Sequence, residues 1–184
     1  RLYSKLGIII MYQGNIHRRN IQSALLKELT AAKNNIYLAI GWIADKGLFG
    51  LLEKKVLEGL DLKMVLIKDE ANEVFQAAFD QLRQQGIEII WLDKIEKEKL
   101  IDHKFVVIDN ATILTGNYNW EHKNPPQEEY LTISKEIPSL VTGFLEEFEY
   151  LSVLNQLSKT DPRPRNSIGD LLRKLNVLKV LLGI

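Results

Sequence analysis

Two stretches decide the fold of this chain: Asp102–Asp109, with the sequence DHKFVVID, and Thr115–Trp120, with the sequence TGNYNW. An apolar run occupies most of the first stretch, which is typical of a buried strand. The tight Asp109-Asn110 turn then predicts that a second strand follows directly. We therefore expect two adjacent strands, over 104–108 and 111–116, with polar residues at their ends.

Helical and strand patterns alternate on both sides of these stretches. Apolar residues recur at helical spacing in three segments, 19–34, 48–57 and 74–82. Gly59 and Gly86 end the second and the third of these predicted helices. Short apolar runs predict strands over 36–43, 62–67, 87–92 and 130–133. A last helix is expected from Pro138 to about Leu154. Alternation of this kind favours an α/β sandwich with a mixed central β-sheet flanked by helices.

The expected organisation is one domain over residues 1–155, a linker over 156–166 and an amphipathic helix over 167–184. Prolines and charged residues mark the linker. A capping-box pattern and a regular apolar stripe mark the helix. That helix could dock on its own domain, pair in a dimer or lead into a further domain.

Composition narrows the function classes. The chain has 184 residues, and its 24 Lys and Arg balance its 24 Asp and Glu, so nucleic-acid binding would need a local basic patch. It has no cysteine, which excludes disulfides, cysteine nucleophiles and cysteine-ligated zinc. No apolar run is long enough for a membrane span, and no segment has a signal-peptide pattern, so we expect a cytoplasmic location.

The segment 86–133 resembles the phospholipase D superfamily, in its single-motif nuclease-like branch. The motif of that family is H-x-K-x4-D, about six residues, then G-S-x-N. Lys104, Asp109, Gly116 and Asn119 fall in register with it. Glu129 follows the second stretch by nine residues, where that branch carries a glutamate. The resemblance extends over roughly residues 12–150.

The resemblance implies metal-independent hydrolysis of phosphodiesters, with no cofactor. In the family, one histidine attacks phosphorus to form a phosphohistidine, and a second histidine protonates the leaving oxygen. Single-motif chains pair as two-fold homodimers, so that both motifs share one active site. The expected partners are therefore nucleic acid, DNA or RNA, and a second copy of the chain.

Site roles follow from the same resemblance, position by position. Lys104 and Asn119 would bind the phosphate and stabilise its developing charge. Asn117 stands in the serine position and could still donate a hydrogen bond to the phosphate. Asp109 would orient the site through hydrogen bonds, and Glu129 would pair with the motif histidine.

The position of that histidine holds Asp102. A carboxylate there repels a phosphodiester by roughly 4 kcal/mol at 4 Å and an effective dielectric constant near 20. His103 is a poor substitute, because side chains alternate along a strand and His103 would face away from the phosphate if Lys104 faces it. We therefore expect Asp102 to occupy the nucleophile position and hydrolysis to be impaired.

Three hypotheses follow. The first is a homodimeric domain of nuclease type with an impaired active site. The second is a catalytically inactive module that binds nucleic acid or serves in assembly. The third is a phospholipid hydrolase, although the sequence has no amphipathic basic helix and no evident membrane anchor.

Overall fold

The computed structural model describes residues 13–92, 103–118, 120–121 and 129–160. Within these ranges, seven strands form one sheet in the order β1-β9-β7-β6-β2-β4-β5. The strands are β1 (Gln13–His17), β2 (Asn35–Ile40), β4 (Asp61–Ile67), β5 (Glu88–Leu92), β6 (Lys104–Ile108), β7 (Thr112–Gly116) and β9 (Leu131–Lys135). A separate parallel pair joins β3 (Ile43–Ala44) to β8 (Trp120–Glu121).

The sheet has a parallel half and an antiparallel half, and β2 is the strand where they meet. β2 pairs parallel with β4, which pairs parallel with β5. On its other side β2 pairs antiparallel with β6, with Ile40 opposite Lys104. β7, β9 and β1 continue the antiparallel half outward from β6.

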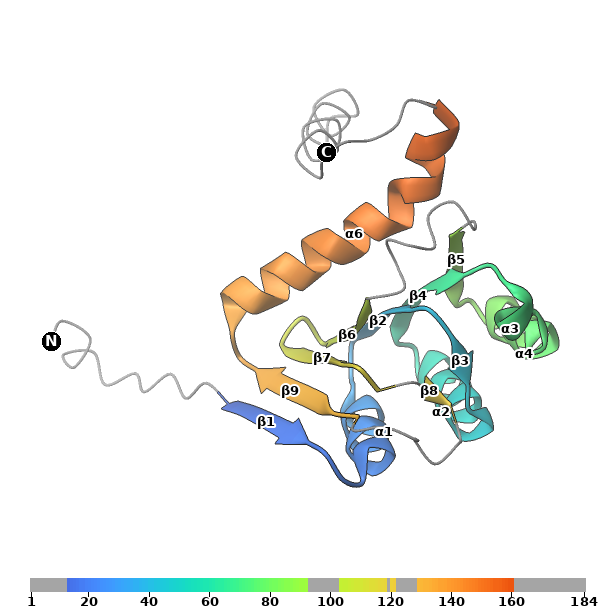
Figure 1. The fold of residues 1–184 in the computed structure, drawn as a ribbon. Coiled ribbons are helices and arrows are strands. Elements are labelled where there is room, and N and C mark those ends of the chain that lie inside the picture. Colours follow the sequence, from blue (N-terminus) through green and yellow to red (C-terminus); the bar gives the residue numbers. More distant parts are fainter. Residues whose placement is uncertain (1–12, 93–102, 119, 122–128, 161–184) are drawn as a thin grey trace, which may run out of the picture.

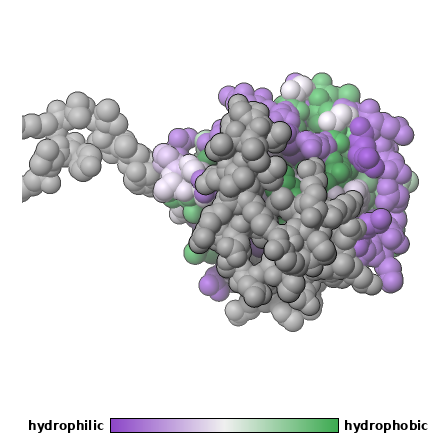
Figure 2. Space-filling model, turned by 90° about the horizontal axis from the view of Figure 1, so that it is seen from above, coloured by the Kyte–Doolittle hydropathy of each residue, from purple (hydrophilic) through white to green (hydrophobic). Residues whose placement is uncertain are grey.

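Helices cover both faces of the sheet (Figure 1). One face carries α1 (Ile21–Ala31), α2 (Lys46–Leu57) and α4 (Gln76–Gln84), and the single turn α3 (Glu70–Glu73) lies beside α4. The other face carries α6 (Pro138–Thr160). Figure 2 shows hydrophilic residues along the side on which α3 and α4 lie. None of the helices in these described ranges is both long and apolar enough to cross a membrane.

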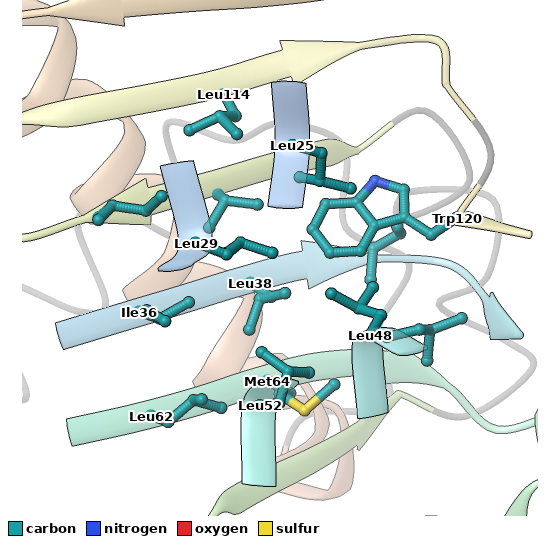
Figure 3. Packing of buried hydrophobic residues seen from close by; sticks show 14 of the residues in the cluster. Leu25, Leu29, Ile36, Leu38, Leu48, Leu52, Leu62, Met64, Leu114 and Trp120 are labelled. Atoms are coloured by element: carbon teal, nitrogen blue, oxygen red, sulfur yellow. The ribbon is translucent and has the colours of Figure 1, made fainter. Parts of the chain in front are cut away.

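Two apolar cores lie on the two faces of the sheet. The larger one packs α1, α2 and α4 against the sheet, and Figure 3 shows its side chains converging with Trp120. The smaller one packs α6 against the sheet and includes Phe105, Val107 and Leu151. Side chains of β6 therefore alternate between the cores, since Val106 and Ile108 belong to the larger one.

The predicted α/β sandwich with a mixed sheet is confirmed, and several boundaries differ from the predictions. The segment predicted as one helix over 74–82 begins with the two-residue turn that follows α3 and continues as α4, and Val74, in that turn, is 79% exposed. β1 and β8 were not predicted. α6 continues to Thr160, beyond the predicted end near Leu154 and into the predicted linker. The predicted C-terminal helix over 167–184 lies outside the described residues.

Candidate phosphate-binding site

One edge of the sheet gathers most of the predicted site residues that the structure describes. β2 and β4 end at this edge, β6 begins there, β7 ends there and β9 begins there. Lys104, Asn117 and Glu129 consequently come together from three separate parts of the chain. The carboxyl ends of parallel strands are also where α/β proteins commonly bind ligands.

Lys104 is the half-buried first residue of β6. Its Nζ donates a hydrogen bond to the backbone oxygen of Asn117 at 3.2 Å. Strand alternation places Lys104 on the same side of the sheet as Val106. Val106 belongs to the larger core, which packs α1, α2 and α4 against the sheet and is called the α1–α2 core. An ammonium group is thus held at the edge by the neighbouring strand, where it can attract an anionic oxygen.

Asn117 directly follows β7, and its side chain makes a hydrogen bond to the residue that precedes β9. Its Oδ1 accepts a hydrogen bond from the backbone N–H of Tyr130 at 2.7 Å. The preceding Gly116 leaves no room for a side chain, because a Cβ there would lie 2.1 Å from the Tyr130 carbonyl oxygen. The carboxamide oxygen of Asn117 therefore has a structural partner in the backbone of Tyr130.

Glu129 lies next to a buried tyrosine at the same edge. Tyr118 is 7% exposed, and burial raises the pKa of its hydroxyl. The carboxylates of Asp45 and Glu129 raise that pKa further, since both disfavour a phenolate nearby. The phenol of Tyr118 is therefore neutral at physiological pH, with the carboxylates of Asp45 and Glu129 close enough to act on it.

Asp45 is a member of this edge that the motif does not indicate. Its carboxylate is 6% exposed and caps α2 by accepting the N–H groups of Gly47, at 2.7 Å, and Leu48, at 3.1 Å. Gln22 of α1 donates a further hydrogen bond to it. Its place between a strand and a helical stripe is a recognisable N-cap pattern, but its proximity to Tyr118 depends on the tertiary fold.

Asp109 lies at the other end of β6. Five residue steps separate it from Lys104, which is about 17 Å along an extended strand. Its carboxylate accepts the backbone N–H groups of Lys33, Asn34 and Asn35 at 2.7 to 3.2 Å. The structure therefore does not bring Asp109 to the phosphate site, and its hydrogen bonds fix the β6–β7 turn to the loop before β2.

His103 points to the opposite side from Lys104. Its Nε2 lies 2.8 Å from Oε1 of Glu147 on α6, and its ring lies edge-on to Phe105, which belongs to the α6 core. The prediction that His103 faces away from Lys104 is confirmed. His103 therefore cannot take the place of the motif histidine from this position.

Two of the predicted site residues, Asp102 and Asn119, lie outside the described residues. In the part of the chain that the structure describes, no three His, Asp or Glu side chains are grouped so that they could hold a metal ion. The site that can be built from described residues thus has one ammonium group, one carboxamide, one neutral phenol and two carboxylates that act on that phenol.

Known proteins share this architecture. The crystal structure of Nuc from Salmonella typhimurium, a phospholipase D family member, superposes with a TM-score of 0.65 at 20% identity, over 76% of this chain and 93% of Nuc. NucT from Helicobacter pylori gives 0.66 at 11% identity, over 77% of this chain and 96% of NucT. TrmBL2, an archaeal chromatin protein with a novel mode of DNA binding, gives 0.54 at 19% identity, over 76% of this chain and 51% of TrmBL2.

These identities are low enough that the likeness establishes the fold alone. No curated protein sequence matches the chain significantly. The family model described as "Cardiolipin synthase, PLD-like domain" matches residues 25–152, which is well over half of the chain and includes both stretches of the motif. The chain therefore belongs to the phospholipase D superfamily.

Proposed function

We propose that this chain is a phosphodiesterase domain of nuclease type that binds nucleic-acid phosphates and whose hydrolytic step is impaired at position 102. The observation that carries the proposal is the ammonium group of Lys104, held 3.2 Å from the Asn117 backbone oxygen at the edge where three strands of the motif region meet. An ammonium held in this way can bind a phosphoryl oxygen without first reorganising.

The impairment follows from the chemistry of the nucleophile. The family reaction needs an imidazole that attacks phosphorus and is regenerated near neutral pH. The carboxylate of Asp102 repels an approaching phosphodiester, and it does not exchange protons near pH 7 as imidazole does. The ammonium group of Lys104 offsets part of this repulsion, so binding persists while attack on phosphorus is slow. Neither binding nor attack requires a metal ion.

The active form in this proposal is a homodimer acting on DNA or RNA. A two-fold interface presents the same surface from both copies, so two Lys104 ammonium groups could face one phosphodiester. TrmBL2, which shares the fold, binds DNA, and this supports nucleic acid as a ligand here. Sedimentation of the full chain, with and without an oligonucleotide, tests the oligomeric state.

A cleavage assay in chelator tests the proposal. The natural chain should bind DNA or RNA and cleave it slowly. Asp102→His should raise cleavage by about a hundredfold or more, the scale of a restored acid–base group. Adding Lys104→Ala to the Asp102→His chain is the matched control, and cleavage should fall again. The proposal fails if Asp102→His cleaves nothing and the natural chain binds no nucleic acid.

A second candidate is a catalytically inactive module for nucleic-acid binding or assembly, and the aspartate at position 102 is the observation that favours it. This candidate predicts salt-dependent binding without cleavage, before and after Asp102→His. Turnover of cardiolipin vesicles, with no action on nucleic acid, would instead favour the phospholipid hydrolase.

A further inference from the structure

An exposed aromatic side chain lies beside the candidate phosphate site. Among the described residues, the exposed large apolar side chains are Ile16, Leu57, Val74 and Tyr130, and only Tyr130 is aromatic. Tyr130 is 41% exposed and directly precedes β9, at the sheet edge that also carries Lys104. A phenol ring in this place offers part of a flat apolar face to solvent at the end of the sheet that carries the candidate phosphate site.

The backbone beneath this ring is fixed on two sides. The N–H of Tyr130 is bound by Oδ1 of Asn117 at 2.7 Å. The carbonyl oxygen of Tyr130 packs on Gly116 so closely that a Cβ there would come within 2.1 Å. The ring is therefore attached to an ordered part of the sheet edge, which lowers the entropic cost of binding a ligand against it.

Two hydrogen bonds, both to Asn117, connect the backbone of Tyr130 to Lys104. Asn117 binds the N–H of Tyr130 with its side chain and Nζ of Lys104 with its backbone oxygen. Since β7 lies between β6 and β9, the backbones of Lys104 and Tyr130 are two strand spacings apart, about 10 Å. A nucleic-acid strand that lies across this end of the sheet could therefore place one phosphate at Lys104 and the base of a neighbouring nucleotide at Tyr130.

The two groups lie on different sides of the edge. Leu131 and Ile133 of β9 face the α1–α2 core, so we infer that alternation continued to the residue before β9 puts Tyr130 on the side that carries α6. Lys104 lies on the α1–α2 side. A nucleotide strand crossing the edge would thus present its phosphate to one side and its base to the other, an arrangement that requires a base free of its pairing partner.

We propose that Tyr130 is a stacking platform for an unpaired nucleobase, and that single-stranded nucleic acid is the ligand class of this edge. The inference rests on the proposed function and deepens it. Stacking on an aromatic ring tolerates any base, because every base has a π face, so the contact selects single strands without selecting a sequence.

Binding of two oligonucleotides of equal length, one of thymidine and one abasic, separates the base contact from the phosphate contacts. Tyr130→Ala should weaken binding of the thymidine oligonucleotide about tenfold or more, the scale of one lost stacking contact, and leave binding of the abasic one within about twofold. Tyr130→Phe should bind both as the natural chain does. Leu57→Ala, which removes an exposed apolar side chain at the far end of α2, is the matched control and should change neither.

The outcomes separate the inference from the proposed function. If the natural chain binds neither oligonucleotide, the proposed function fails. If it binds both and Tyr130→Ala weakens neither, or weakens both equally, the stacking platform is wrong. Sedimentation of Tyr130→Ala should match that of the natural chain, and a loss of dimer that accounts for the weaker binding would also overturn the inference.

Discussion

Asp109 provides a test of whether each part of the motif acts on the phosphate or on the fold. In Asp109→Gly the carboxylate that accepts the N–H groups of Lys33, Asn34 and Asn35 is lost. Asp109 has a φ of 53°, a left-handed conformation that glycine adopts without strain, so this substitution isolates the hydrogen bonds from the turn geometry.

The expected cost follows from the surroundings of the three donors. Asn35 is 8% exposed, so its N–H, left without the carboxylate, costs about 1–3 kcal/mol. Lys33 and Asn34 are exposed and can turn to water, so their two hydrogen bonds contribute about 0.5 kcal/mol each. The sum is about 3 kcal/mol, a sizeable share of the roughly 5–15 kcal/mol by which a domain of ordinary stability resists unfolding.

Thermal unfolding and oligonucleotide binding measure the two roles separately. Asp109→Gly should lower Tm by about 6–12 °C, while binding below the transition stays unchanged because Lys104 lies about 17 Å away along β6. The control is Asp80→Ala, which removes an exposed aspartate of α4 and should shift Tm little. Alanine is used there because glycine would itself destabilise the helix. If Asp109→Gly had a normal Tm and bound the oligonucleotide more weakly, Asp109 would act on the phosphate and not on the fold.

Three further predictions concern other parts of the fold. Gly116→Ala should destabilise the chain by about 2 kcal/mol or more in urea unfolding, because its Cβ would meet the Tyr130 carbonyl at 2.1 Å; an unchanged midpoint would contradict the packing at this edge. Burial and the hydrogen bond to a carboxylate raise the pKa of Tyr37 from 10.0 to about 12, so stability from this group is present below pH 10 and is lost as the pH rises from 10 to 12. Tyr37→Phe should lack that loss in thermal melts across this range, and equal losses in both chains would show that Tyr37 is not its source. His103→Asn should leave the cleavage regained by Asp102→His within about threefold, since His103 faces Glu147 of α6, and an abolished cleavage in a folded chain would show that the imidazole at 103 takes part.

The sequence predicted the strands with apolar runs and missed those without them. β1 has the sequence QGNIH, and its one apolar side chain, Ile16, is 65% exposed, so no alternation of buried and exposed residues marks this edge strand. Apolar spacing also predicted one helix through Val74, which instead lies in the turn between α3 and α4. Spacing alone does not distinguish a helix from a turn that brings the next apolar residue back to the core.

The site was predictable where strand geometry alone decides it. Alternation along β6 correctly separates His103 from Lys104, and the five steps to Asp109 already imply the length of a whole strand. The partner of the Asn117 carboxamide was not predictable, because it is a backbone N–H thirteen residues later that becomes a neighbour only when β9 pairs with β7. Backbone donors carry no residue-specific pattern, so such contacts appear only in the folded chain.

The meeting of parallel and antiparallel halves at β2 has a consequence for the order of folding. β2, β4 and β5 follow one another with helices between them, whereas β6 must find β2 across a separation of 72 residues between Ile36 and Ile108. Contacts that close long loops form slowly, so we expect the parallel half to act as a template on which the strands bearing the candidate phosphate site assemble last. Val106→Ala should then speed unfolding and leave the refolding rate nearly unchanged, whereas slowed refolding would place β6 in the folding nucleus. On this view the candidate phosphate site is completed only at the final stage of folding.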